Sequence, residues 1–253
     1  MVLTEDVRKR FAPVAANYVT SSFHASPERL DEVIVLAEPN AADIVLDVGT
    51  GPGNTALALA PHVAHVTGLD LTPEMLDQAR RITAERGVTN VDWVLGDAER
   101  LPFPDSSFDL YTARAAPHHF HDIGAALNEA FRVLKPGGRA CFIDCSAPAE
   151  ARDHLHRVEI LRDPSHIRTL TLAEWRFELE HVGFRVERAS LRELDWEFAP
   201  WVVRIGVPAD EVEPIAAVLE AAEGPARTQL RPQRRDGKLW HAYWHGLIRA
   251  RRP

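Results

Sequence analysis

From residue 44 onward, short apolar runs alternate with amphipathic segments, which is the pattern of strands separated by helices. Such alternation predicts a parallel sheet that helices cover on both faces. We therefore expect an α/β fold, a Rossmann-like doubly wound sheet of seven strands, mostly parallel, with an antiparallel last strand. The predicted strands are Ile44–Val48, His65–Leu69, Val91–Leu95, Phe108–Ala113, Arg139–Cys145, Phe184–Leu191 and Leu239–Ile248.

Helices are expected before the first strand and between the later ones. Residues Leu3 to Val19 are amphipathic, and Pro13 predicts a kink in this segment. Ser26 followed by Pro27 predicts the start of a second helix. These two helices lie either over the open end of the sheet or on its flank. Helices between the strands are expected at Asn54–Pro61, Pro73–Glu85 and Ile123–Leu134.

Capping signals and breaks in the pattern divide the chain. Thr72 is the expected N-cap of the helix that Gly87 ends, and Thr171 with Glu174 forms a capping-box pattern. Residues 196–236 do not follow the alternation. We expect a single domain, with an N-terminal helical lid (1–40), a core (41–195), an insertion or cap (196–236), and a closing strand and tail (237–253).

A glycine-rich turn follows the first predicted strand. The strand contains Asp47, and the turn has glycine at every second position, Gly49, Gly51 and Gly53. Glycine permits positive φ and close approach of a ligand, and the helix after the turn offers free N–H groups. A dinucleotide, a ligand with a cationic group, and no ligand all stay open here. Asn54 stands where the dinucleotide pattern requires glycine, and Asp47 suits a cation better than a pyrophosphate.

Composition limits the partners. The chain has 253 residues, 45% of them hydrophobic, and a formal net charge of −8. An acidic protein does not attract nucleic acid or an anionic membrane, and no apolar run has the ~20 residues of a membrane span. Cys141 and Cys145 lie about 13 Å apart in one predicted strand, too far for a disulfide. With no secretory signal in the sequence, we expect a cytoplasmic protein.

Further polar residues follow the other predicted strands. In an open parallel sheet, ligands bind beyond the carboxyl ends of the strands. Asp70 follows the second strand, about 20 residues after the glycine turn, where a carboxylate suits the ribose of a nucleotide cofactor. Segments with polar side chains also follow the third, fourth and fifth strands, Gly96–Glu99, Arg114–Phe120 and Asp144–Ser146.

Together these motifs resemble the class I S-adenosylmethionine-dependent methyltransferases. The glycine turn resembles their D-x-G-x-G-x-G loop, and Gly96–Asp109 resembles the third motif of their small-molecule branch. Glu129–Gly138 resembles the helix and turn before their fifth strand. The resemblance covers about residues 44 to 145, and the later motifs resemble the ubiquinone and menaquinone biosynthesis type. It implies S-adenosylmethionine as cofactor, S-adenosylhomocysteine as product and a small-molecule methyl acceptor.

The resemblance also implies roles for single residues. Asp47 and the turn backbone would face the methionine moiety, Asp70 the ribose hydroxyls, and Asp97 the adenine amino group. Tyr18 would close over the cofactor from the N-terminal helix. The expected cofactor-binding residues are Tyr18, Asp47, Gly49, Thr50, Gly51, Gly53, Asn54, Asp70, Leu71, Met75, Asp97, Ala98 and Arg114.

Methyl transfer needs a base only if the acceptor must lose a proton, and histidine is the usual choice near neutral pH. His118 and His119 follow the fourth strand, and Asp144 is placed to orient a histidine. The candidate catalytic residues are His118, His119, Asp144, His166 and Arg168, the last two from the variable stretch that shapes the acceptor site in the family. An ordinary structural role stays open for each.

Other chemistries have less support. His118, His119 and His121 lack the carboxylate or cysteine spacing that would complete a metal site, so no metal is expected. Cys145 is a possible nucleophile, but no Pro-Cys follows the fourth strand, and buried cysteines are usually inert. The N-P-P-Y type sequence of amino-group methyltransferases is also absent there.

We therefore expect S-adenosylmethionine-dependent methyl transfer to oxygen or carbon of a small apolar or aromatic metabolite. The tryptophans of the last third of the chain line the acceptor pocket or fill the core, Trp175, Trp196, Trp201, Trp240 and Trp244. Two alternatives stay open: a cofactor-binding protein of the same fold without methyl transfer, and a nicotinamide-dependent oxidoreductase. We expect a monomer or homodimer and no nucleic-acid partner.

Overall fold

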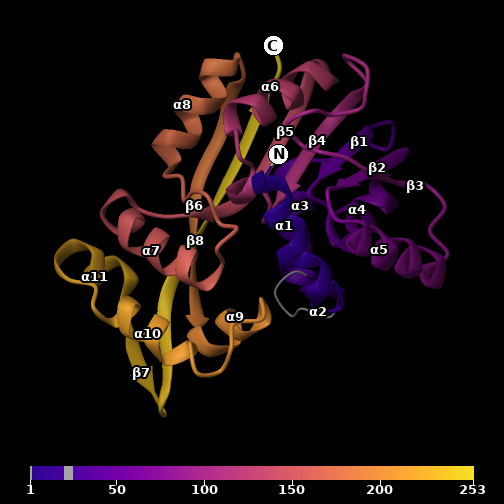
Figure 1. Cartoon of the computed structure of the whole chain (residues 1–253). Coiled ribbons are helices and arrows are strands. Elements are labelled where there is room, and N and C mark those ends of the chain that lie inside the picture. The colour runs from indigo at the N-terminus through magenta and orange to yellow at the C-terminus, as the bar shows by residue number, and fades with distance from the viewer. Residues whose placement is uncertain (1, 20–24) are drawn as a thin grey trace.

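A single sheet runs through the molecule in the strand order β3-β2-β1-β4-β5-β8-β6, and a short strand β7 pairs with β8 (Figure 1). It is seen in a computed structural model that describes residues 2–19 and 25–253, without the side chains of residues 2–6. The pairings of β8 are antiparallel and the others are parallel. The strands are β1 Ile44–Val48, β2 His65–Asp70, β3 Val91–Leu95, β4 Phe108–Arg114, β5 Leu134–Ser146, β6 Arg185–Glu197, β7 Gln233–Arg235 and β8 Lys238–Arg251. The expected fold class is confirmed.

The central strands are buried on both faces, which is why they appear in the sequence as continuous apolar runs. Val45 and Leu46, neighbours in β1, are both 0% exposed, and so are Leu110 and Tyr111 in β4. β5 begins five residues earlier than predicted. Leu134 already pairs with Phe108 across an irregularity in β4, so the segment expected to be only a turn joins the sheet.

Helices cover both faces of the sheet (Figure 1). They are α1 Val2–Phe11, α2 Ala15–Val19, α3 Pro27–Ala37, α4 Asn54–Leu59, α5 Pro73–Arg86, α6 Ile123–Val133, α7 Ala149–Arg162, α8 Leu172–Val182, α9 Phe198–Arg204, α10 Val212–Glu220 and α11 Gly224–Leu230. The sequence did not predict α7. Its buried face includes His154, Glu159 and Arg162, so it lacks the apolar stripe that identifies a helix. None of the helices in the described part is long and apolar enough to cross a membrane.

Some capping predictions are confirmed and others are wrong. Thr171 and Glu174 form a complete capping box, and Gly87 ends α5 with a φ of +65°. The side chains of Ser26 and Thr72 make no capping hydrogen bond, although each precedes a helix that begins with proline. The N–H of Thr72 donates to Asp70 Oδ1 instead, at 2.8 Å.

The two N-terminal segments take different positions. A single 3₁₀ turn at Ala12–Val14 separates α1 from α2, so the kink expected at Pro13 is present. α1 and α2 lie over the carboxyl ends of the strands, and the Asn54 side chain donates to the carbonyl of Tyr18 at 3.3 Å (Figure 1). α3 packs on the flank against α4, β5 and β8.

The segment predicted as an insertion forms α9, α10, α11 and β7 beside the long hairpin of β6 and β8 (Figure 1). It shares a second hydrophobic core with α7, and Trp201 and Trp244 are buried in it. Trp175 belongs instead to the main core beneath the sheet. The tryptophans therefore serve mainly as core residues, and Trp196 and Trp201 also reach a cavity.

Candidate active site

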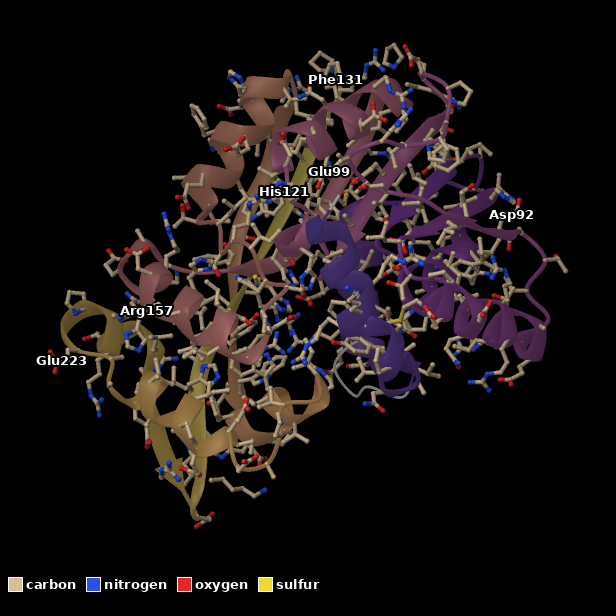
Figure 2. All side chains as sticks on the ribbon, viewed as in Figure 1. Asp92, Glu99, His121, Phe131, Arg157 and Glu223 are labelled. Carbon is tan, nitrogen blue, oxygen red and sulfur yellow. The ribbon has the colours of Figure 1, made fainter. Side chains whose placement is uncertain are left out.

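A large cavity opens at the carboxyl ends of β1, β2 and β4, where an open parallel sheet binds its ligands. We call it the first cavity; it holds about 1010 Å³ of space between atoms, part of it open to solvent. It is lined by eleven of the thirteen expected cofactor residues, Tyr18, Gly49, Thr50, Gly51, Asn54, Asp70, Leu71, Met75, Asp97, Ala98 and Arg114. Glu99 and His121, labelled in Figure 2, also line it.

The three glycines of the turn have different reasons to be glycine. All have positive φ, but a Cβ on Gly49 would lie 2.3 Å from the Ala116 side chain, and one on Gly53 would lie 2.4 Å from the Trp93 ring. A Cβ on Gly51 would meet only Met75 Sδ, at 4.0 Å, and would otherwise occupy cavity space. Gly51 is thus where the turn backbone is open to a ligand. Gly53, expected at the cofactor, packs against Trp93 instead and does not line the cavity.

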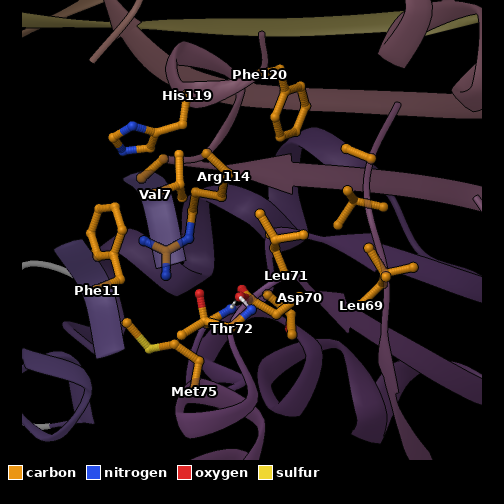
Figure 3. Close-up of a pocket in the computed structure, with 18 of the residues that line it drawn as sticks. Val7, Phe11, Leu69, Asp70, Leu71, Thr72, Met75, Arg114, His119 and Phe120 are labelled. Carbon is orange, nitrogen blue, oxygen red and sulfur yellow. Dashed lines mark hydrogen bonds between the residues drawn. The ribbon is translucent and has the colours of Figure 1, made fainter. Parts of the chain in front are cut away.

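Asp70 fixes the glycine turn and faces the first cavity. Its Oδ2 accepts the N–H of Gly51 at 2.7 Å, and its Oδ1 accepts the N–H of Thr72 (Figure 3). Burial raises the pKa of Asp70, although these backbone hydrogen bonds act in the opposite direction. Each carboxylate oxygen retains a lone pair for a further donor, so Asp70 can also bind a pair of hydroxyls.

Asp47 lies one layer behind the first cavity and does not line it, which departs from the expected direct contact. Its two oxygens accept the hydroxyls of Thr50 at 2.6 Å and Thr112 at 2.7 Å. Burial raises the pKa of Asp47 to about 6. The side chain therefore fixes the turn through Thr50, and a ligand would sense its charge but not touch it.

The far wall of the first cavity comes from α1, α2 and β4. Val7, Phe11 and Arg114, labelled in Figure 3, all line it. Arg114 Nε donates to the hydroxyl of Thr55 at 2.8 Å, and burial lowers the pKa of Arg114 to about 10. Phe11 packs edge-on against Tyr18, with ring centroids 5.6 Å apart. Among the described residues, the N-terminal helices thus complete the site.

A second cavity adjoins the first and shares Phe11, Tyr18, Ala115 and His119 with it. It holds about 460 Å³ of space between atoms. Its other lining residues come mainly from α7, α9 and β8, namely His118, Cys145, Arg162, Asp163, Trp196, Trp201, Arg204, Ile205, Tyr243 and His245. Two adjoining cavities with one shared wall suit two reactants that meet at the junction.

His118 lines the second cavity and forms a buried pair with Asp144, which does not line it. His118 Nδ1 lies 2.6 Å from Asp144 Oδ1, which leaves Nε2 as the ring nitrogen for a ligand. Burial lowers the pKa of His118, but the charge and hydrogen bond of Asp144 outweigh it, so the pKa is raised. The structure brings these two predicted residues together from β5 and the loop after β4.

The other three catalytic candidates differ from this pair. His119 Nδ1 donates to the carbonyl of Ser165 at 3.0 Å, and burial lowers the pKa of His119 to about 3. His166 packs beside His118, with ring centroids 5.1 Å apart, but lines neither cavity. Arg168 donates to the carbonyls of Phe120 and His121 and lies outside both cavities, so it braces the loop after β4.

A buried network behind the second cavity was missed at the sequence level. Glu159 Oε2 forms an ion pair with Arg162 Nη2 at 3.0 Å, and Glu159 Oε1 accepts a hydrogen bond from the hydroxyl of Tyr243 at 2.7 Å. The Arg162 guanidinium also lies 4.4 Å from the centre of the Trp201 ring. These residues come from α7, α9 and β8, far apart in the sequence. The only local signal was the presence of three charged residues, Glu159, Arg162 and Asp163, within five positions.

Cys145 belongs to two groups of side chains that have the atoms to bind a metal ion, but the carboxylates of these groups already have hydrogen-bond partners. Within the described residues, two groups of side chains place ligand atoms within 4.8 Å of one another, His118, Asp144 and Cys145, and Cys145, Glu159 and His166. Asp144 already binds His118 of the same group, and Glu159 already binds Arg162 and the hydroxyl of Tyr243. Burial raises the pKa of the Cys145 thiol well above its ordinary value, which disfavours the thiolate that a nucleophile needs.

Comparison with known proteins covers both the core and the whole chain. Residues 46–142 match the family described as Methyltransferase domain. A Bacillus subtilis protein called uncharacterized methyltransferase YcgJ is 40% identical over 222 residues, which are 86% of this chain and 87% of that protein. The crystal structure of YcgJ has a TM-score of 0.83 at 36% identity and covers 88% of this chain and 97% of that one.

More distant relatives are similar over less of the chain or only in fold. The demethylmenaquinone methyltransferase of Listeria monocytogenes is 34% identical over 151 residues, 57% of this chain and 64% of that protein. An S-adenosylmethionine-dependent methyltransferase from Mesorhizobium loti has a TM-score of 0.58 at 21% identity, covering 88% of this chain and 96% of that one. The latter similarity concerns the fold alone.

Proposed function

Because the chain belongs to the methyltransferase family, we propose that it uses S-adenosylmethionine to methylate oxygen or carbon of a small aromatic metabolite in the second cavity. The observation that carries the proposal is the pair of adjoining cavities, with Gly51 and Asp70 lining the first and His118, which Asp144 holds from behind, lining the second. Family membership argues against the nicotinamide-dependent oxidoreductase.

The residues of the first cavity fit S-adenosylmethionine. Gly51 leaves open the space that a Cβ would occupy, and Asp70 is placed to accept two ribose hydroxyls. Asp97, Leu71 and Met75 also line the first cavity, where Asp97 would accept a hydrogen bond from the adenine amino group and Leu71 and Met75 would pack against the adenine. The cofactor, when bound, supplies a methyl group already activated on a sulfonium. The protein must then mainly orient the acceptor and exclude water, and orientation alone is worth about 7–11 kcal/mol.

His118 is the proposed general base. Asp144 holds Nδ1, so Nε2 receives the proton that the acceptor loses, from its hydroxyl for methylation at oxygen or from the reacting C–H for methylation at carbon. The charge of Asp144 then stabilises the imidazolium that forms. His119 stays neutral at physiological pH because of its lowered pKa, and it positions the acceptor at the junction of the cavities.

Calorimetric titration tests the cofactor assignment first. S-adenosylmethionine and S-adenosylhomocysteine should bind saturably and NAD should not. Asp70→Ala should weaken both affinities by about tenfold or more, since a charged hydrogen bond contributes about 1.5–3 kcal/mol. Binding of NAD alone would refute the assignment.

A metabolite-pool methylation assay with labelled cofactor tests the reaction. His118→Ala should bind S-adenosylhomocysteine like the parent protein and lower turnover about 10²–10⁴-fold. A protein that binds the cofactor but labels no acceptor in any pool would support the non-catalytic alternative of the same fold.

A further inference from the structure

Two hydrogen-bond acceptors face each other in the wall of the second cavity. Asp163, which directly follows α7, places its Oδ2 3.9 Å from Nε2 of His119, and both residues line this cavity. At that distance the two atoms make no hydrogen bond with each other. His119, labelled in Figure 3, also lines the first cavity, whereas Asp163 lines only the second. A ligand group held between the two atoms would therefore belong to the methyl acceptor and not to the cofactor.

The hydrogen bond on the other side of the His119 ring decides where its proton lies. Nδ1 carries the proton, because its partner at 3.0 Å is the carbonyl of Ser165, which can only accept. The neutral ring therefore keeps a lone pair on Nε2. Burial, and then the charge of His118, lowers the pKa of His119 to about 3, so the ring takes up no second proton near neutral pH. Nε2 of His119 thus has no hydrogen to give to the Asp163 carboxylate.

Asp163 is 0% exposed, and its two oxygens differ in their partners. Oδ1 accepts the N–H of Ser165 at 3.0 Å and its hydroxyl at 2.6 Å, and lies 3.8 Å from Arg10 Nε. Oδ2 has no hydrogen-bond partner among the residues that the structure describes. Burial raises the pKa of Asp163, but the surrounding groups, Arg162 and Ser165 among them, lower it by more, so the carboxyl is ionised. A buried, ionised oxygen without a donor is costly, and a donor on a ligand would remove that cost.

An amino group fits this pair of atoms better than a hydroxyl does. A hydroxyl has one hydrogen and can donate to only one of the two atoms, whereas an amino group can donate to both. Trp196 and Trp201 line the same cavity, and their flat rings favour a planar ligand. An amino group on an aromatic ring is uncharged near neutral pH, so the neighbouring guanidinium groups do not repel it.

On the proposed function rests a more specific assignment: we infer that the second cavity takes an aminophenol, whose amino group donates to His119 Nε2 and Asp163 Oδ2 and whose hydroxyl lies at His118. The rings of His118 and His119 have their centroids 4.0 Å apart, so one aromatic ring can carry both groups. The space of about 460 Å³ suits one or two rings without a long apolar chain.

The test compares matched amino and methyl probes on protein loaded with S-adenosylhomocysteine. The ortho, meta and para isomers of aminophenol, and the corresponding methylphenols, are titrated by calorimetry, because a methyl group has the size of an amino group but donates no hydrogen bond. At least one aminophenol should bind about tenfold or more tightly than its methylphenol. Asp163→Asn keeps an oxygen for Ser165 and places an amide N–H against His119, so it should remove this preference. Asp153→Asn, at an exposed carboxylate of α7, is the matched control and should keep the preference.

Four results would overturn the inference. Three of them are methylphenols that bind as tightly as the aminophenols, a preference that survives in Asp163→Asn, and no binding of either series to the loaded protein. The fourth is weaker binding of S-adenosylhomocysteine by Asp163→Asn with an unchanged melting temperature, which would assign Asp163 to the amino group of the cofactor. Unchanged affinity of the variant for S-adenosylhomocysteine shows that it is folded and that the proposed function still stands. Loss of cofactor binding by the parent protein would instead refute the proposed function itself.

Discussion

At the residue scale, the His118–Asp144 pair predicts a pH dependence. His118 must be neutral to accept a proton, and its pKa is raised by Asp144 against the effect of burial. The value of kcat/KM should therefore rise with pH through a pKa above the ordinary 6.5 of histidine. Asp144→Asn removes the negative charge, so the acid limb should move to lower pH while the plateau falls. A limb that stays in place in Asp144→Asn would exclude His118 as the base.

The glycine turn gives a second prediction at this scale, because Gly51 and Gly53 differ in their surroundings. Gly51→Ala should fold, with about 1 kcal/mol lost to its positive φ, and should bind S-adenosylmethionine weakly because the Cβ enters the first cavity. Gly53→Ala forces a Cβ onto the Trp93 ring and should cost roughly 2–3 kcal/mol of stability.

Urea unfolding and calorimetry on both glycine variants separate the two effects. Equal loss of stability in the two proteins would contradict the distinction. So would full cofactor affinity in Gly51→Ala.

At the element scale, two helices that each have a hydroxyl residue at the expected N-cap should respond differently to its mutation. Thr171→Ala breaks the capping box of α8 and should cost about 1 kcal/mol of unfolding free energy. Ser26→Ala is the control, because the Ser26 side chain makes no capping hydrogen bond, and it should change stability by less than about 0.5 kcal/mol. Denaturant midpoints measure both. A larger loss in Ser26→Ala would mean that it caps α3 in solution.

What the sequence could predict also differs between elements. Strands β1 to β4 and the glycine turn were accessible because their signals are local: apolar runs, glycine spacing and acidic residues at strand ends. The start of β5 was missed because its pairing with Phe108 is a contact between distant segments. α7 was missed because its buried face carries charged side chains, and their burial depends on contacts with distant elements, such as the Tyr243 hydroxyl that donates to Glu159.

The same reasoning explains the uneven prediction of the candidate site. Eleven cofactor residues line the first cavity, because most of them lie at or shortly after the carboxyl ends of β1 to β4, which meet at one edge of the sheet. Arg204 in the second cavity comes from an insertion without a motif, and only the packing of α9 on β6 and β8 brings it there. Arg168 was placed in the site by its position in the chain, but it binds backbone carbonyls outside both cavities.

At the scale of the whole molecule, the buried Asp47 should make the unfolding free energy depend on pH. Its folded pKa of about 6 exceeds its ordinary value of 3.8, so between these pH values the folded state binds more protons than the unfolded state. Stability from this group is therefore present at low pH and is lost as the pH rises through 6, by up to about 3 kcal/mol.

Comparison with Asp47→Asn isolates this contribution of Asp47. The unfolding free energy of the parent protein, minus that of the variant, should fall between pH 4 and pH 6 and stay level above. Urea titrations at each pH measure the difference. A difference that is flat or rises over this range would show that Asp47 is not buried as described.

The position of β8 in the sheet affects how the chain folds during its synthesis. β8 lies between β5 and β6 and pairs with both along most of their length, yet it is synthesised after them. On the ribosome, β5 and β6 therefore present open edges until residues 238–251 emerge, and open edges invite pairing with other chains. The second cavity, which needs Tyr243 and His245, cannot form before that moment. A nascent chain stalled before residue 238 should thus bind chaperones and remain protease-sensitive beyond β5. A chain extended by an added C-terminal linker, so that residues 238–251 have left the ribosome, should not.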